Sequence, residues 1–266
     1  MLTKKRILSI NVSSGAYEDF VETIFDYSSN NNSKYVCLAN VHMLVEAQNS
    51  PKFRQVVNSA DIVAPDGMPI AKSLGVFHDI KQQRIDGLGL MQNLLAQCTE
   101  RNQSVYFYGG TTGMLSKAEA FLHDKYPGLK IAGSYSPPFR NLTEAEKAEV
   151  ANNITVSGAN LVFVALGCPK QEAFMNEMRG KIPAVMLGIG GALPMMIGTV
   201  KRAPKWMQKI SMEWLYRLMQ EPARLFKRYA VTNTQFLFMV IKEMLKTKTS
   251  HSKKASTAAP SYGKAA

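Results

Sequence analysis

Cysteine and histidine are scarce in this sequence, and neither residue is spaced as a metal site requires. The 266 residues include 3 cysteines, Cys37, Cys98 and Cys168, which lie far apart and form no CxxC pair. The 4 histidines also lack metal-ligand spacing. This pattern favours a reducing compartment and argues against a disulfide framework or a zinc cluster.

Long apolar runs are absent as well. The longest run near the C-terminus, residues 236–241, has 6 members, whereas a helix that spans a membrane needs about 20. Basic residues at positions 4–6 precede an apolar run that Ser9 interrupts, and this run is too short for the core of a signal peptide. We therefore expect a cytoplasmic chain whose membrane contact is peripheral.

Several catalytic motifs are missing. The sequence contains no GxSxG, HExxH or P-loop pattern, so the serine hydrolase, zinc protease and P-loop classes have no motif support. It also has no Asp-x-Asp pair of the kind that holds a metal on a nucleotide-sugar diphosphate. We expect no metal and no cofactor, so backbone amides and basic side chains would have to stabilise an anionic leaving group.

Acidic residues are rare in the last quarter of the chain. Residues 199–266 hold 14 Lys and Arg against 3 Glu, whereas residues 1–198 hold 18 basic and 17 acidic side chains. Almost all of the net charge of +12 therefore lies at one end. A near-neutral body with a cationic end predicts an anionic partner for that end.

The cationic end also carries both tryptophans of the chain. Trp206, Ile210 and Trp214 are four residues apart, which predicts one stripe along a single helix. Lysines and arginines flank the stripe, as in helices that lie on anionic membranes. Alternatively, the stripe packs on the domain with its charges solvated, or the basic end binds nucleic acid. We favour the membrane over nucleic acid because the charges alternate with Trp, Met, Leu and Phe.

Apolar segments alternate with segments of helical periodicity up to residue 198. The predicted strands cover residues 6–12, 35–39, 61–64, 105–108, 129–133, 161–166 and 184–187. This order predicts an α/β fold with a Rossmann-like, mostly parallel sheet and crossover helices. We assign residues 1–198 to this catalytic domain, 199–245 to a basic, amphipathic, helical appendage and 246–266 to a disordered tail.

Parallel sheets of this kind bind ligands at the carboxyl ends of their strands. Asp66, in a Pro-Asp-Gly turn, could act as a general base or cap the next helix. Asn40 could bind a sugar hydroxyl or cap a helix. Gly109 and Gly110 could offer amides to a phosphate or form only a tight turn. Gly190 follows the last predicted strand.

Two further segments stand near predicted helix starts. GCPKQE, at residues 167–172, places Gln171 in a first helical turn that faces the strand ends. Proline, glutamine and glutamate there are also good capping chemistry. RIDG, at residues 84–87, offers Arg84 as a cation before a helix, or as half of an ion pair.

Together these segments resemble the bacterial WecG/TagA/CpsF family, glycosyltransferase family 26. The resemblance covers residues 7–240. It is strongest in PDG at 65–67, RIDG at 84–87, YGG at 108–110, GCPKQE at 167–172 and the appendage at 200–229. It implies inverting transfer of a sugar from a UDP-sugar to an undecaprenyl-diphosphate-linked saccharide. That reaction takes place on the inner face of the plasma membrane and serves cell-surface polysaccharide or teichoic acid synthesis.

The resemblance also implies roles for individual residues. Asp66 matches the proposed catalytic base, and Asn40 and Gln171 match residues of the nucleotide-sugar pocket. We place in the same donor site Arg84, Gly109, Gly110 and Gly190. The appendage would close over the site and meet the lipid diphosphate and the membrane. The residues expected to do so are Arg202, Arg217, Arg224, Arg228, Trp206 and Trp214.

The chain departs from the family pattern at two places. Leu38 stands where a threonine often precedes the asparagine, and Leu193-Pro194 stand where many members carry an aspartate. Both departures bear on the donor sugar, which could be of the N-acetylmannosamine type, a uronic acid or a hexose. The alternative functions are a non-catalytic UDP-sugar-binding module and a nucleic-acid-binding protein, and a homo-oligomer is left open.

Overall fold

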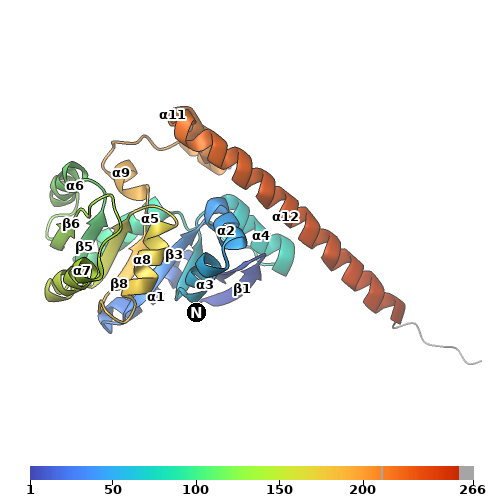
Figure 1. Cartoon of the computed structure of the whole chain (residues 1–266), viewed down its shortest axis with the longest axis horizontal. Coiled ribbons are helices and arrows are strands. Elements are labelled where there is room, and N and C mark those ends of the chain that lie inside the picture. Colours follow the sequence, from blue (N-terminus) through green and yellow to red (C-terminus); the bar gives the residue numbers. More distant parts are fainter. Residues whose placement is uncertain (211, 258–266) are drawn as a thin grey trace, which may run out of the picture.

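A six-stranded parallel sheet forms the centre of the computed structural model, which describes residues 1–210 and 212–257 (Figure 1). The strand order is β4-β3-β8-β7-β5-β6, and every neighbouring pair is parallel. The strands are β3 (Lys34–Ala39), β4 (Ile62–Pro65), β5 (Ser104–Gly109), β6 (Lys130–Tyr135), β7 (Leu161–Ala165) and β8 (Val185–Gly188). The predicted α/β, Rossmann-like fold is confirmed.

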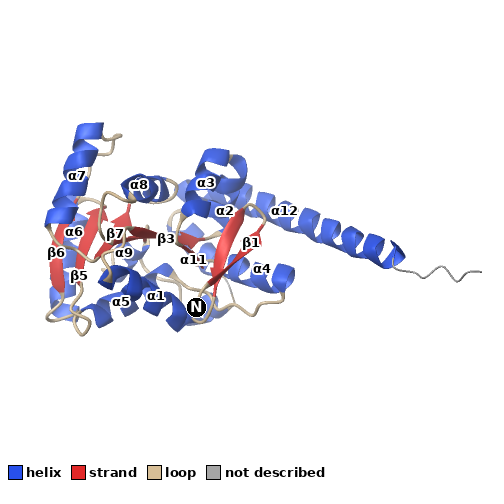
Figure 2. Cartoon of the chain, turned by 90° about the horizontal axis from the view of Figure 1, so that it is seen from below, coloured by secondary structure: helices blue, strands red, loops and turns tan. Residues whose placement is uncertain are grey.

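Helices cover both faces of the sheet, as crossover connections between parallel strands require (Figure 2). One apolar core contains residues of α2 (Val41–Asn49), α3 (Pro51–Ser59), α4 (Met68–His78), α7 (Glu144–Val156) and α8 (Lys170–Met178). The other contains residues of α1 (Tyr17–Ser29), α5 (Gly87–Cys98), α6 (Thr112–Lys125) and α9 (Ala192–Met196). Strand residues alternate between the two cores: Phe163 belongs to the second, and Val162 and Val164 belong to the first.

The predicted first strand, residues 6–12, is wrong. The chain instead forms an antiparallel hairpin, outside the parallel sheet, from β1 (Thr3–Ile7) and β2 (Ile10–Ser14). Leu8, in the two-residue connection, has a φ of 54°. Hairpin turns of this length use such positive φ values, and glycine or asparagine normally marks them in a sequence. Leu8 and Ser9 are neither glycine nor asparagine, so the apolar pattern of the sequence predicts one continuous strand.

The C-terminal quarter of the described chain contains three helices, so the predicted single stripe is wrong. These helices are α10 (Lys205–Lys209), α11 (Glu213–Gln220) and α12 (Pro222–Thr257). The backbone N–H of Met212 donates to the carbonyl of Met207 at 2.8 Å, a step of five residues that takes the chain off the α-helical path. Trp206 and Trp214 therefore lie on different helices.

α12 extends away from the body of the molecule (Figure 1). Its first half lies against α2, where Asn49 Nδ2 donates to Gln235 Oε1 at 3.2 Å. The helix continues through residues 246–257, so this part of the predicted disordered tail is helical. The segment contains no Pro or Gly to stop the helix. Residues 258–266 of that predicted tail lie outside the described residues.

Candidate functional site

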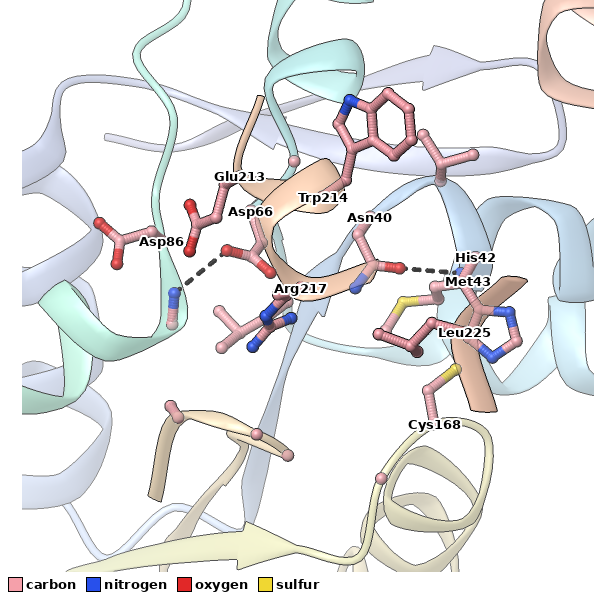
Figure 3. Close-up of a pocket in the computed structure, with 18 of the residues that line it drawn as sticks. Asn40, His42, Met43, Asp66, Asp86, Cys168, Glu213, Trp214, Arg217 and Leu225 are labelled. Atoms are coloured by element: carbon pink, nitrogen blue, oxygen red, sulfur yellow. Dashed lines mark hydrogen bonds between the residues drawn. The ribbon is translucent and has the colours of Figure 1, made fainter. Parts of the chain in front are cut away.

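A cavity of about 550 Å³ opens at the carboxyl edge of the sheet (Figure 3). Residues that follow β3, β4, β7 and β8 line it from the body, and α11 with the first turns of α12 line it from the appendage. Parallel α/β sheets bind their ligands at this edge. The predicted site residues that line the cavity are Asn40, Asp66, Arg84, Gln171, Gly190, Trp214, Arg217, Arg224 and Arg228.

Asp66 follows β4, and its side chain bonds to the backbone of a neighbouring loop. Its Oδ1 accepts the N–H of Gly87 at 3.1 Å, the dashed contact in Figure 3. The first helical residue of α4 is Met68, whose N-cap is Gly67 without a side-chain capping bond. The alternative that Asp66 caps this helix is therefore wrong.

The surroundings of Asp66 raise the pKa of its carboxyl group to about 6. Burial is the largest cause, and the negative charge of Asp86 adds to it. Arg84, Arg217 and the Gly87 N–H act in the opposite direction. A carboxylate that titrates near pH 6 is well matched to a general base at neutral pH, because it is ionised but still basic enough to take a proton.

Asn40 follows β3, and its two predicted roles, helix cap and sugar ligand, are compatible with each other. Its Oδ1 accepts the N–H of Met43 at 3.1 Å, so it caps α2. It also lines the cavity, and this capping bond leaves its Nδ2 group as a donor. The sugar-binding role remains a prediction.

Gln171 lies in the first turn of α8 and is 5% exposed. Its Oε1 accepts the N–H of Gly167 at 3.1 Å, and its Nε2 donates to Glu172 Oε1 at 2.8 Å. A Cβ atom at Gly188 would stand 2.8 Å from Gln171 Nε2, so the end of β8 needs glycine to approach this amide. Two backbone segments and one buried carboxyl group thus hold the orientation of Gln171.

Gly109 and Gly110 lie at the end of β5, and the structure does not bring them to the cavity. β7 separates β5 from β8 in the sheet, and neither glycine is among the residues that line the cavity. Gly109 has a φ of 107°, and a Cβ atom there would stand 2.8 Å from the backbone of Ala165. The tight-turn alternative accounts for this glycine pair.

The basic residues of the appendage divide into two groups. Arg217, Arg224 and Arg228 line the cavity. Arg202 does not line it and instead bonds through Nη2 to Asp86 Oδ1 at 2.7 Å. Trp206 also lies outside the cavity, with 63% of its surface exposed. The diphosphate role predicted for Arg202 therefore has no geometric support.

Arg84 meets both of its predicted descriptions. It lines the cavity, and its Nη1 donates to Glu213 Oε2 at 2.9 Å. It is therefore a cation at the site and half of an ion pair with the appendage.

The polar or ionisable residues that line the cavity and that sequence patterns did not assign to the site include His42, Asp86, Cys168 and Glu213. Burial, followed by the nearby charge of Arg228, lowers the pKa of His42. Glu213 had one available signal, because it is one of only 3 acidic residues after position 198. A carboxylate retained in so cationic a segment marks a specific ion pair.

Neither a metal site nor a membrane-spanning helix is found among the described residues. No three His, Cys, Asp or Glu side chains there are grouped so that they could hold a metal ion. No helix within 1–210 or 212–257 combines the length and apolarity needed to cross a membrane.

Comparison with known proteins gives a consistent result. The model of the glycosyl transferase WecG/TagA/CpsF family matches residues 5–250. The N-acetylglucosaminyldiphosphoundecaprenol N-acetyl-beta-D-mannosaminyltransferase of Bacillus spizizenii is 34% identical over 199 residues, 74% of this chain and 76% of the relative. The protein of the same name from Bacillus subtilis is 31% identical over 199 residues, 74% of this chain and 75% of the relative. The chain belongs to the WecG/TagA/CpsF family of glycosyltransferases.

Proposed function

We propose that this glycosyltransferase moves a sugar from a UDP-sugar to a saccharide linked to polyprenyl diphosphate. The names of the two Bacillus relatives, which specify an N-acetylglucosaminyldiphosphoundecaprenol acceptor, support the lipid-linked substrate. The family resemblance of the cavity segments supports the UDP-linked donor. We expect the product to enter a cell-surface polysaccharide or a teichoic acid.

The observation that carries this proposal is the Asp66 carboxyl group in a cavity lined by arginines. Asp66 has a pKa of about 6, and Arg84, Arg217, Arg224 and Arg228 line the same cavity. A base near neutral pH and a cluster of cations are the two groups needed to activate a hydroxyl and to release a diphosphate.

The proposed reaction is a single displacement. Asp66 takes the proton of the acceptor hydroxyl while the oxygen attacks the anomeric carbon of the donor. A C–O bond forms on one face of the sugar as the bond to UDP breaks on the other, so the configuration inverts. The electron pair leaves with UDP, and Arg217, Arg224 and Arg228 neutralise its diphosphate, which contributes several kcal/mol in a site with little water.

The two departures from the family pattern both lie at the site. Leu38 and Pro194 line the cavity, and Leu38 also contacts Gly87 closely enough that a Cβ atom there would stand 2.7 Å from Leu38 Cδ1. Apolar side chains there offer no hydrogen bond to a donor hydroxyl or amide. We infer that these two departures determine which donor sugar the pocket accepts. The candidates are a sugar of the N-acetylmannosamine type, a uronic acid and a hexose.

The exposed surface of the appendage suits an anionic membrane. Large apolar side chains lie exposed on α10 and α12 among lysines, and they include Trp206, Phe226, Leu237, Phe238 and Leu245. Such surfaces bind anionic lipid through apolar insertion together with charge attraction. We place the enzyme peripherally on the inner face of the plasma membrane, where confinement raises its effective concentration near the lipid acceptor.

A panel of UDP-sugars incubated with the purified chain and membrane lipid extract tests the reaction. We expect release of UDP with one donor, dependent on lipid, together with a lipid product heavier by one sugar residue. Binding of UDP-sugar without release would indicate the non-catalytic binding module instead.

Flotation with anionic vesicles, compared with oligonucleotide binding at the same salt concentration, separates the membrane from a nucleic-acid partner.

A further inference from the structure

Four charged side chains form a closed ring at the boundary between the body and the appendage. Arg84 and Asp86 come from the loop before α5, whereas Arg202 and Glu213 come from the appendage. Two short bonds cross the boundary, Arg84 Nη1 to Glu213 Oε2 at 2.9 Å and Arg202 Nη2 to Asp86 Oδ1 at 2.7 Å. The remaining contacts, Arg84–Asp86 at 3.8 Å and Arg202–Glu213 at 3.9 Å, complete the ring.

This charge ring is more shielded from solvent than the exposed ion pair between Arg101 and Glu22. The side chains of Arg84 and Glu213 are 17% and 19% exposed. The pair between Arg101 and Glu22, by comparison, is 35% and 61% exposed. Partial burial weakens screening by water and salt, so the charge ring holds the appendage more strongly than an exposed pair would.

Both sides of the charge ring lead to the Asp66 carboxyl group. On the body side, the loop that carries Arg84 and Asp86 continues into Gly87, whose N–H bonds to Asp66. On the appendage side, Glu213 opens α11 and Arg217 follows one helical turn later, on the same helix face. Figure 3 shows Asp86, Glu213 and Arg217 gathered around Asp66.

We propose that Glu213 is a positioning residue: through the charge ring it holds α11, and with it Arg217, over the Asp66 carboxyl group. The inference deepens the proposed function, on which it rests. Arg202 does not line the cavity, and Glu213, which does, bonds through its carboxylate to Arg84. Docking of α11 limits the access of water to Asp66 and brings Arg217 within reach of the leaving diphosphate.

We therefore expect loss of the charge ring to change the pKa of Asp66 as well as the fit of the substrate. The charged and polar groups that face Asp66 are Asp86, Arg84 and the Gly87 N–H from one loop and Arg217 from α11. Burial is the main cause that raises the pKa of Asp66. When α11 moves away, water reaches the carboxyl group and its pKa falls toward the ordinary value of an aspartate.

The first test is the pH profile of kcat/KM for UDP release by Glu213→Gln. We expect kcat/KM at neutral pH to fall about 10- to 100-fold and the acidic limb to move about one pH unit downward, away from pH 6. Glu22→Gln, which breaks the exposed pair with Arg101, is the matched control and should keep both the rate and the limb. A limb that stays at its wild-type pH in Glu213→Gln would overturn the proposal, because a purely structural defect lowers the active fraction without moving the limb.

The second test does not depend on catalysis. Tryptic cleavage between residues 199 and 228 should become about tenfold faster in Glu213→Gln and in Arg202→Gln, because both open the charge ring. The double variant should be cleaved no faster than either single variant, since the ring is already broken. Wild-type cleavage rates in both single variants would overturn the proposal, and Arg202→Gln keeps it testable if Glu213→Gln does not fold. Cleavage still reports on the ring if the wild-type chain releases no UDP, an outcome that would contradict only the proposed function.

Discussion

Asp66 combines a solvent-poor position with a path to the cavity. Its carboxyl group accepts one backbone hydrogen bond, from Gly87, and lines the cavity with its remaining lone pairs available. Burial and the charge of Asp86 keep its pKa near 6 despite two arginines nearby. An aspartate in this state gives up little solvation when it takes a proton from a substrate.

The first prediction concerns catalysis by this side chain. Asp66→Asn keeps the shape and the acceptor for the Gly87 N–H but removes the base, so we expect folded protein with transfer reduced about 10²- to 10⁴-fold. UDP release under saturating donor and lipid acceptor measures the effect. Turnover close to the wild-type rate would remove Asp66 from the mechanism.

The second prediction concerns stability. The folded-state pKa of Asp66 is raised from 3.8 to about 6, so the ionised form is disfavoured in the folded protein. This cost is absent below pH 4, grows as the pH rises from about 4 to 6, and is complete above pH 6. Asp66→Asn should therefore raise the free energy of unfolding at pH 7 by about 1–3 kcal/mol, and leave it unchanged at pH 4.

Denaturant unfolding of both proteins at the two pH values checks this expectation. An equal difference at pH 4 and pH 7 would mean that the carboxyl group is not buried in the way described. The control variant Glu22→Gln should show no comparable increase in the free energy of unfolding over the wild-type protein at pH 7.

At the residue scale, the sequence could indicate where Asp66 and Gln171 lie but not what surrounds them. A Pro-Asp-Gly turn after a strand predicts a side chain at the sheet edge, and the structure puts it there. The pKa of Asp66 depends on Arg217, 151 positions later in the chain, and no local pattern reports that approach. Gly109 and Gly110 were predicted at the site from their position at a strand end, but they do not line the cavity. A strand-end position alone does not reveal which strands are neighbours in the sheet.

At the element scale, β8 and the first turn of α8 approach each other closely at the site. Gly188 ends β8, and a Cβ atom there would stand 2.8 Å from both Gln171 Nε2 and Met175 Cε. The absence of a side chain thus allows the first turn of α8 to lie against the sheet and present Gln171 to the cavity.

Gly188→Ala is the third prediction. The added methyl group must displace Gln171 or Met175, so we expect a loss of about 1–3 kcal/mol in unfolding free energy and weaker donor binding. Gly113→Ala in α6 is the matched control: nothing lies within 4 Å of the added Cβ, and the substitution should stabilise the protein by up to about 1 kcal/mol. Thermal unfolding and donor KM report the two effects, and equal behaviour of the two variants would contradict the packing described.

The buried strands and their order along the chain could be predicted from the sequence, because both faces of a buried parallel strand are apolar. The run at 161–166 predicts β7, and its residues alternate between the two cores as expected. The hairpin at the N-terminus and the break between α10 and α11 were not readable. Each depends on one backbone turn, at Leu8 or between Met207 and Met212, and neither turn contains a glycine or proline that would mark it in the sequence.

At the scale of the whole molecule, the chain separates a near-neutral sheet domain from a cationic helical appendage. Charge counting could predict that separation, whereas the closing of the appendage over the strand ends was expected only from the family resemblance. The appendage supplies three arginines to the cavity and exposes apolar side chains on the far parts of α12. In the proposed mechanism one segment therefore meets the leaving diphosphate, Asp66 and a lipid surface.

The most direct measurement of this account is lipid-dependent UDP release by the full chain carrying Arg217→Gln, Arg224→Gln and Arg228→Gln together. The matched control, Lys52→Gln with Lys117→Gln and Lys125→Gln, removes the same charge from exposed positions of the body. We predict a fall in kcat/KM of at least about 10²-fold for the arginine variant and a rate close to wild type for the lysine variant. Equal rates for the two variants would contradict the claim that the appendage completes the active site.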